Sequence, residues 1–381
     1  MDRSPTLCSS VPSVTHRPAT PSPPPSPTSP TPHGESAGRE PQNPGARPVT
    51  GRGGDDGGRE PHATPEPGSA DPGRADPGRA DPEHAGGRAG GATVLVAGCG
   101  DLGTEVALRL SARGESVVGV RRRAEVLPAG VRGLSVDLTR EIPHLPPGSY
   151  ERLAVILTAD GRDAEAYRET YVGGLRRTLA ALDAAGVRPQ RAVLVSSTGV
   201  YGDSVGDIDE STPVAPSRPT HDVLLEAEEL IAHALPHATV LRLSGLYGPG
   251  RSRFLEKARR GEVDDHWTNR IHRDDAAAAI VHLLGAAAPA AGAPADDRRD
   301  GAAVARLYLG TDRLPAHAVD VADEIRRLEG LPPLTPRPRA GEQEGRRLDS
   351  SALVGTGFAF THPTYVEGYA AVLGGAGRRH P

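Results

Sequence analysis

Three glycines near residue 100 have the spacing of a phosphate-binding loop. Residues 94–97 are apolar and indicate a buried strand, the pattern G-x-G-x-x-G follows, and an amphipathic segment comes after it. In such a loop one glycine makes the tight turn off the strand, another lets the backbone approach a pyrophosphate, and the third lets the helix pack against the strand. The N-terminus of the helix then offers free N–H groups to the phosphates. The predicted dinucleotide-binding residues of this loop are Gly98, Gly100, Asp101, Leu102 and Gly103.

Arginines follow the second predicted strand, at the position that contacts the ribose of a bound dinucleotide. Residues 116–120 form this strand, and Arg121, Arg122 and Arg123 come directly after it. Sites that prefer NAD usually place Asp or Glu here to accept from the 2′-hydroxyl, whereas NADP sites use Arg against the 2′-phosphate. The chain is rich in arginine throughout, which reduces the weight of any one cluster. Arg121 and Arg122 still favour NADP over NAD as the cofactor.

Polar side chains also follow the other predicted strands. In an open parallel sheet ligands bind beyond the carboxyl ends of the strands, so residues at these ends face one crevice. Asp137 could accept a hydrogen bond from an adenine amino group, although a turn-capping Asp would give the same pattern. The residues predicted to hold the cofactor together with the glycine loop are Asp137, Thr158 and Ser244.

Strands alternate with helices up to residue 250. Apolar strand-like runs occur at residues 94–97, 116–120, 133–136, 153–157, 192–195 and 238–243. Helical periodicity separates them, as in residues 165–185, and this alternation is typical of a parallel sheet with right-handed crossovers. After residue 250 the pattern predicts helices at residues 254–260, 276–284, 316–330, 348–354 and 365–373 and strands at residues 306–310 and 357–360.

These patterns predict an α/β protein. We expect a Rossmann-type, doubly wound parallel sheet in residues 92–250 and a small C-terminal α+β substrate lobe in residues 251–381, folded with the core as one unit. Residues 1–91 differ in composition, because they are mostly Pro, Gly, Ser, Thr, Arg, Asp and Glu, and no Phe, Trp or Tyr occurs before Tyr150. Such a segment cannot bury enough apolar surface to offset its chain entropy, so a disordered N-terminal tail is predicted.

Charge, cysteine content and hydropathy exclude several classes of protein. The net charge of -5 gives no sign of a nucleic-acid surface. The two cysteines, Cys8 and Cys99, form no disulfide framework, and no residues have metal-ligand spacing, so no metal is predicted. No apolar run is long enough for a membrane span, and the N-terminus lacks the apolar core of a signal peptide. We expect a cytoplasmic protein with a small-molecule substrate; a homodimer is compatible with these features.

Several motifs together resemble the short-chain dehydrogenase/reductase superfamily, and more narrowly its extended group of NAD-dependent epimerase/dehydratases. The resemblance covers residues 93–375, and it implies a dinucleotide held by the glycine loop and a substrate held by the C-terminal lobe. The spacing of the first glycines is one residue shorter than is usual in this group. The motifs are the glycine loop, V-S-S-T-G-V-Y-G at residues 195–202, E-x-x-P at 210–213, L-x-G-x-Y-G-P-G at 243–250 and N-R-I-H-x-D-D at 269–275.

The catalytic residues of that family are largely absent. The family uses a Tyr-x-x-x-Lys pair, in which the Lys lowers the pKa of the Tyr and a Ser or Thr assists. The resemblance places the assisting hydroxyl at Ser197, but Thr220 stands where the Tyr belongs and Leu224 where the Lys belongs. An upstream Asn of the family falls at Tyr171. Lys257 is the only lysine of the chain and lies in the other lobe, so the resemblance implies an atypical member.

Other side chains could replace the missing pair. His221 stands beside Thr220, and an imidazole titrates near neutral pH, although a lone His at a helix start is often only a surface residue. The candidate catalytic residues are Ser197, His221 and Tyr201, and the candidate substrate-binding residues are Tyr247, Trp267 and Arg270. We expect an oxidoreductase or epimerase acting on a small carbonyl or sugar-like substrate with a non-standard active site. The alternative is a non-catalytic NADP-binding sensor or regulatory protein.

Overall fold

A parallel sheet of seven strands lies at the centre of the computed structural model, which describes residues 93–285, 306–334 and 345–381. The tail predicted for residues 1–91 lies outside the described residues. The strand order is β11-β7-β5-β4-β1-β2-β3, which is the order of a doubly wound Rossmann sheet with one added edge strand. The strands are β1 (Thr93–Ala97), β2 (Ser116–Arg121), β3 (Arg132–Ser135), β4 (Tyr150–Val155), β5 (Arg191–Ser197), β7 (Thr239–Leu243) and β11 (Arg306–Gly310).

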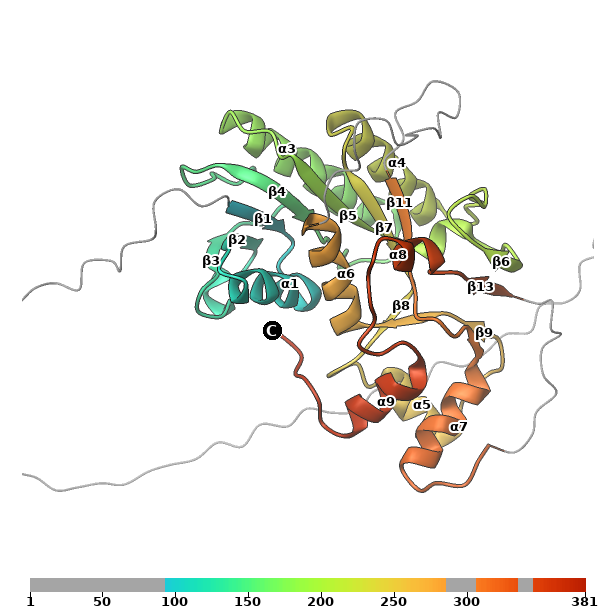
Figure 1. The fold of residues 1–381 in the computed structure, drawn as a ribbon. Helices are drawn as coiled ribbons and strands as arrows, with labels where there is room; N and C mark the ends of the chain where they lie inside the picture. Colours follow the sequence, from blue (N-terminus) through green and yellow to red (C-terminus); the bar gives the residue numbers. More distant parts are fainter. Residues whose placement is uncertain (1–92, 286–305, 335–344) are drawn as a thin grey trace, which may run out of the picture. The chain divides into compact units, whose positions relative to one another are not determined.

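Helices cover both faces of this sheet (Figure 1). Helices α1 (Asp101–Ala112) and α6 (Arg273–Gly285) lie on one face, and α3 (Gly174–Ala184) and α4 (Pro219–Ala234) lie on the other. Successive side chains of a strand point to opposite faces. In β1 this places Val94 and Val96 in the core formed with α1 and α6, and Leu95 and Ala97 in the core formed with α3 and α4. The predicted fold class is therefore confirmed.

The connection before α3 is not a regular α-helix. Residues 165–185 were predicted as one helix, and the structure divides them into α2 (Ala164–Tyr167), a π-helical turn η2 (Arg168–Gly173) and α3. A π-helical turn adds a residue to the helical repeat and is frequent near functional sites. Here it carries Tyr171.

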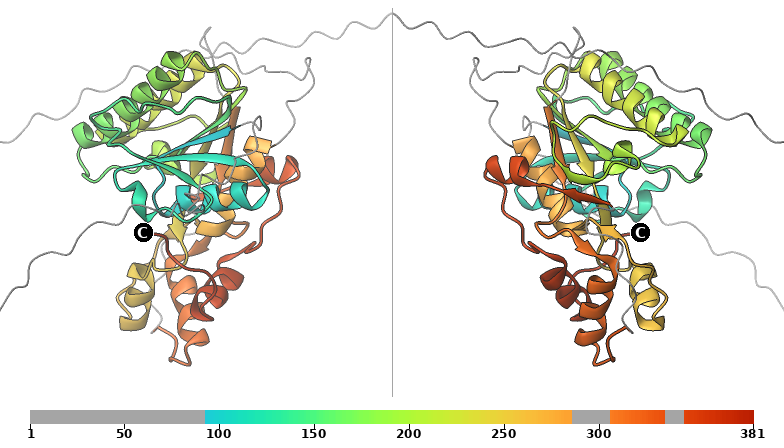
Figure 2. Two further views of the ribbon diagram at one scale, coloured as in Figure 1. Left: turned by 90° about the vertical axis from the view of Figure 1, so that its left-hand side faces the viewer. Right: turned by 90° about the vertical axis from the view of Figure 1, so that its right-hand side faces the viewer.

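The C-terminal lobe lies to one side of the sheet and of the helices that cover it (Figure 2). Its three helices, α5 (Arg253–Arg260), α7 (Ala318–Leu328) and α9 (Tyr365–Leu373), share a separate apolar core that includes Leu255, Val321 and Tyr369. Short strand pairs connect the lobe to the core. They are β8 (Gly245–Tyr247) with β10 (Arg270–His272), β9 (Trp267–Thr268) with β12 (Ala316–His317), and β6 (Gly206–Ile208) with β13 (Arg346–Leu348).

The core extends past residue 250. Both α6 and β11 come from the segment expected to form the lobe, yet α6 packs against α1 and β11 pairs with β7. Two smaller predictions were wrong. Leu348 ends β13, and the helix after it is only α8 (Ser351–Gly355); residues 357–360 form no strand, because Phe358 and Phe360 pack against the core as side chains without backbone pairing. Among the described residues, no helix has the length and apolar character needed to cross a membrane.

Candidate functional site: the glycine loop and the Ser197–His221 pair

Each of the three glycines of the loop has a reason to lack a side chain. At two of them a Cβ would collide with the backbone, and at the third it would block the approach of a ligand. Gly98 has a φ of +94°, and a Cβ on it would lie 2.2 Å from the backbone oxygen of Ile156. A Cβ on Gly103 would lie 2.3 Å from the backbone oxygen of Gly98. At Gly100, by contrast, no atom of the described residues outside the adjoining backbone comes within 4 Å of that position. The open space lies at the N-terminus of α1, so the loop fits a dinucleotide whose pyrophosphate approaches Gly100.

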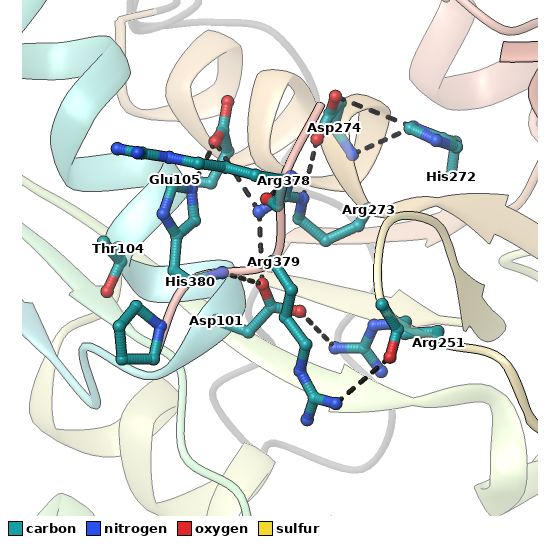
Figure 3. Close-up of polar contacts among 12 residues, drawn as sticks. Asp101, Thr104, Glu105, Arg251, His272, Arg273, Asp274, Arg378, Arg379 and His380 are labelled. Atoms are coloured by element: carbon teal, nitrogen blue, oxygen red, sulfur yellow. Dashed lines mark hydrogen bonds and ion pairs between the residues drawn. The ribbon is translucent and has the colours of Figure 1, made fainter. Parts of the chain in front are cut away.

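The first two side chains of α1 point away from this opening. The Asp101 carboxylate accepts hydrogen bonds from Arg251 Nη2 at 3.0 Å and Arg273 Nη1 at 3.2 Å, so it faces the lobe (Figure 3). Leu102 is buried in the core beneath the loop. The predicted contribution of these two residues to cofactor binding could therefore come only from their backbone N–H groups, which the first turn of a helix leaves unpaired.

Arg121 at the end of β2 and Arg122 after it already have partners within the chain. Arg121 Nη1 donates to the backbone oxygen of Pro381 at 2.9 Å. Arg122 donates to both carboxylate oxygens of Asp160 at 2.5 and 3.1 Å, and this bond raises the pKa of Arg122. Asp160 follows β4 and was not singled out from the sequence, because nothing in the local pattern shows that it meets Arg122. The place expected to bind a 2′-phosphate, at the end of β2, therefore also carries the carboxylate of Asp160.

The remaining predicted cofactor residues differ in their surroundings. Asp137 accepts from the backbone N–H and the hydroxyl of Thr139, and these bonds lower its pKa, so it acts at least as a turn cap. Thr158 is exposed just beyond β4. Ser244 is buried, and both its N–H and its hydroxyl donate to the backbone oxygen of Gly310, which makes it a structural link between β7 and β11.

Ser197 and His221 meet at Gly199. A Cβ on Gly199 would lie 3.2 Å from Ser197 Oγ and 3.4 Å from His221 Nε2, so both atoms face one small space at the carboxyl end of β5. Ser197 caps the turn η3 (Thr198–Tyr201), where its Oγ accepts from Gly199 N at 3.0 Å. Because the oxygen is the acceptor in this bond, its hydrogen can be donated to a ligand.

The surroundings of His221 place the proton of its neutral ring on Nε2, the nitrogen that faces the space beside Gly199. The backbone N–H of Ser217 donates to His221 Nδ1 at 3.3 Å, which leaves the proton of the neutral ring on Nε2. Partial burial lowers the pKa of His221, and the positive charges of Arg218 and Arg346 lower it further. The imidazole is therefore neutral at pH 7 and presents an N–H donor.

Arg346 was not singled out from the sequence. It lies in β13, where its Nη1 donates to the backbone oxygen of Thr198 at 3.0 Å and its charge acts on His221. The sequence gives no local signal for it, because only the pairing of β13 with β6 brings it to this site.

Tyr201 is a core residue and not a proton donor to a ligand. Its ring is fully buried, its hydroxyl donates to the backbone oxygen of Asp209 at 3.2 Å, and it accepts from Arg242 Nη1 at 2.9 Å. Burial raises the pKa of its phenol. Arg242 is held in turn by Glu228, so the hydroxyl belongs to a buried polar network. The sequence could not show this, because a Tyr a few residues past a strand end looks equally suited to line a cleft.

The three positions at which the family's Tyr, Lys and Asn are missing carry no charged side chain. Leu224 is buried on α4, and Tyr171 packs against the same apolar cluster from the π-helical turn. Burial raises the pKa of Tyr171 to about 12. Thr220 is half-buried in the first turn of α4, next to His221. No charged group at these positions could lower a phenol pKa in the way that the family's Lys does.

The predicted substrate residues do not line one cavity. Tyr247 lines a cavity of about 550 Å³ whose wall carries four cations, and Tyr247 also lines a smaller adjoining cavity of about 300 Å³ together with Arg270. Arg270 is buried, bonds to Thr268 and lies over the ring of Phe254, with 4.9 Å from its guanidinium carbon to the ring centre. Trp267 lines a different cavity of about 640 Å³. The first cavity is bounded by Tyr247, Arg251, Arg253, Phe254, Lys257, Tyr369 and Arg379, among others.

Three potential metal ligands come together although no metal was predicted. His272, Asp275 and His362 place ligand atoms within 4.8 Å of one another. The Asp275 carboxylate already accepts from the backbone N–H groups of Thr361 and His362 and from His362 Nδ1. Burial, followed by the neighbouring charge of His362, lowers the pKa of His272 to about 4. The group is accounted for as a buried hydrogen-bonded link between α6 and the segment before α9.

Comparisons with known proteins agree with the glycine loop and the sheet. A family model described as NAD(P)H-binding matches residues 98–287. The Escherichia coli K12 protein YeeZ is 30% identical over 284 residues, which covers 71% of this chain and 96% of YeeZ. The chain therefore belongs to the NAD(P)H-binding proteins of the short-chain dehydrogenase/reductase type, with the NAD-dependent epimerase/dehydratases, and the resemblance seen in its motifs is confirmed.

Solved structures show the same fold. A candidate NAD-dependent epimerase/dehydratase from Methylobacillus flagellatus is 36% identical, with a TM-score of 0.58, over 75% of this chain and 98% of that one. MoeE5, solved in complex with UDP-glucose and NAD, is 22% identical with a TM-score of 0.57 over 74% of this chain and 98% of its own. At this lower identity the likeness to MoeE5 concerns the fold alone.

Proposed function

We propose that this chain is an NADP-preferring oxidoreductase or epimerase for a small carbonyl or sugar-like substrate, with Ser197 and His221 in place of the usual Tyr–Lys pair. The observation that carries the proposal is that Ser197 Oγ and His221 Nε2 both lie within 3.4 Å of one point beside Gly199. That point is at the same edge of the sheet as the glycine loop, where ligands of this fold bind. A cytoplasmic location is part of the proposal.

The two side chains are suited to a reacting carbonyl group. A nicotinamide cofactor, when bound, supplies or accepts a hydride. As a carbonyl carbon gains a hydride its oxygen becomes negative, and preorganised donors that face this oxygen stabilise the developing charge. The hydroxyl of Ser197 and the Nε2–H of the neutral His221 ring are two such donors. In the reverse direction they would orient a substrate hydroxyl.

The cationic cavity supports an anionic substrate. Arg251, Arg253, Lys257 and Arg379 bring four positive charges to one wall, and Tyr247 contributes an aromatic surface. Guanidinium groups bind carboxylate and phosphate oxygens in pairs, and an aromatic ring can stack on a sugar or base. The complex of MoeE5 with UDP-glucose makes a sugar nucleotide a reasonable first compound to test.

The buried Leu224 favours the second candidate function. At the place of the catalytic Lys this chain has a side chain that is 4% exposed and packed in an apolar cluster with Tyr171 alongside. A protein that binds NADP without turnover needs the glycine loop and not the proton-transfer pair. A sensor or regulatory role of this kind is therefore the alternative to catalysis.

Two measurements on the full chain separate these functions. NADPH and NADH are titrated with cofactor fluorescence as the readout. The NADPH complex is then offered small carboxylated aldehydes, which can accept a hydride, and the NADP+ complex is offered UDP-sugars, which can donate one. Catalysis predicts either net change of the cofactor, seen as oxidation of NADPH or reduction of NADP+, or formation of an epimer of the sugar without net change of the cofactor. In each case the rate should fall at least about tenfold in both Ser197→Ala and His221→Phe, because each removes a donor to the developing oxyanion. Binding of NADPH without turnover of any compound would support the sensor, and failure to bind either nucleotide would contradict both functions.

A further inference from the structure

The segment after α9 runs back to the glycine-loop end of α1 and is held there by its backbone (Figure 3). Arg273 Nη2 donates to the backbone oxygen of Arg378 at 2.9 Å, and the backbone N–H of His380 donates to Asp101 Oδ1 at 3.1 Å. Arg121 Nη1 then donates to the backbone oxygen of Pro381 at 2.9 Å. Residues 378–381 are thus joined to α1, α6 and the end of β2.

Side chains of the segment strengthen this attachment. His380 Nε2 lies 2.7 Å from Glu105 Oε2, and the imidazole is 5% exposed. Arg379 Nη1 donates to the backbone oxygen of Gly250 at 3.2 Å. A buried imidazole and an arginine paired with a backbone oxygen indicate a defined docking position for the segment.

The segment leaves one part of the cofactor site open and occupies another. Around Gly100, where a pyrophosphate would approach, no atom of the described residues outside the adjoining backbone lies within 4 Å of the position that a Cβ would take. Arg121, in contrast, is one of the two arginines predicted to contact a 2′-phosphate, and its Nη1 is bonded to Pro381. NADPH and NADH differ only in this phosphate. The attachment of residues 378–381 should therefore affect the binding of NADPH more than the binding of NADH.

We propose that residues 378–381 compete with the 2′-phosphate of NADPH for Arg121 and so set the discrimination between NADPH and NADH. The inference rests on the proposed function in that it needs a dinucleotide at the glycine loop. In this proposal Nη1 of Arg121 exchanges the oxygen of Pro381 for a phosphate oxygen when NADPH binds, whereas binding of NADH leaves the bond between Arg121 and Pro381 in place. The segment thereby lowers the preference for NADPH that the arginine alone would give.

The test compares affinities for NADPH and NADH in the full chain and in variants. Removal of residues 378–381 is expected to raise NADPH affinity about tenfold, the scale of one hydrogen bond to a charged group, and to change NADH affinity less than about threefold. The point variant His380→Ala, which loosens the segment without removing the partner of Arg273, is expected to shift the ratio of affinities in the same direction. In an Arg121→Gln background neither change should alter the ratio.

Each other outcome has a definite meaning. Equal changes for both nucleotides, or weaker binding of both, would overturn the proposal, because the segment would then act as a wall of the site and not as a competitor. If the shortened chain fails to fold, His380→Ala decides the matter by itself. Absence of binding of either nucleotide to the full chain and to every variant would instead overturn the proposed function, and this inference with it.

Discussion

The guanidinium of Arg273 lies 3.2 Å from the carboxylate of Asp101, which joins the first residue of α6 to the first residue of α1. Both helices pack on the same face of the sheet, and Asp101 directly follows Gly100 of the glycine loop. Arg273 is 2% exposed and also faces Glu105 and Asp274. One buried cation therefore compensates three carboxylates at the ends of two helices.

Replacing Arg273 by Met should destabilise the protein strongly. Removing one partner of a buried ion pair leaves uncompensated charge, so we expect a loss of about 3–5 kcal/mol in the free energy of unfolding. Arg251→Met is the matched control, because Arg251 contacts the same Asp101 but is 31% exposed, and it should cost about 1 kcal/mol or less. Urea unfolding of the two variants measures both values. Equal losses would show that burial does not decide the contribution of these pairs.

Alanine at Gly103 and at Gly100 should separate folding from cofactor binding. A methyl group at Gly103 would lie 2.3 Å from a backbone oxygen, so Gly103→Ala should cost about 1–3 kcal/mol of stability or more. Gly100 has an ordinary φ of -77° and open space around it, so Gly100→Ala should leave stability within about 1 kcal/mol. It should still weaken NADPH binding at least about tenfold, because its methyl group would stand where the pyrophosphate approaches. Thermal unfolding and fluorescence titration give the two readouts, and unchanged NADPH affinity in Gly100→Ala would contradict the placement of the cofactor.

The fold could be predicted from the sequence because its signals are local. The spacing of Gly98, Gly100 and Gly103 and the alternation of apolar runs with helical periodicity each occupy a few neighbouring residues. The alternation of strands and helices predicts a parallel sheet with right-handed crossovers, whereas the order of the seven strands is known only from the structure. Short strands such as β6 and β13 were missed, since pairs of three residues carry no periodicity.

The site could be predicted only in part. Ser197 and His221 were singled out from motif positions, and the structure places both beside Gly199, while their catalytic role stays a prediction. The burial of Tyr201 and the bond between Arg121 and Pro381 depend on segments that meet only in the folded chain. Side-chain type and strand position show where a polar residue stands, but its exposure is set by tertiary packing.

Cys99 should be unreactive in the folded protein. Its thiol is completely buried, and burial raises its pKa to about 12, which leaves only about 0.01% as the nucleophilic thiolate at pH 8. In a Cys8→Ser background we expect a disulfide reagent to modify Cys99 only after urea unfolds the chain. Rapid stoichiometric modification of the folded protein would contradict this and would indicate a reactive thiol.

Removing the charge of Arg346 should raise the pKa of His221. Partial burial, Arg218 and Arg346 all hold this pKa below its ordinary value of 6.5, so Arg346→Gln, which removes one of the two positive charges, should move it upward. Arg347→Gln is the matched control, because Arg347 precedes Leu348 on the same strand but bonds to Asp207. NMR titration of the imidazole, assigned with His221→Asn, measures the shift.

The same titration has a consequence for the proposed activity. The neutral ring carries the Nε2 proton that faces Ser197, and protonation of Nδ1 would break its bond from Ser217 N. Because the pKa is lowered, the neutral form and any contribution of the ring to stability are present above pH 6.5 and are lost as pH falls through the lower, folded-state pKa. The protonated ring keeps its Nε2–H but loses the bond from Ser217 N that orients it, so turnover should decline on the acid side. The decline should begin at higher pH in Arg346→Gln than in Arg347→Gln. An acid limb that does not move with the measured pKa of His221 would remove this residue from the proposed chemistry.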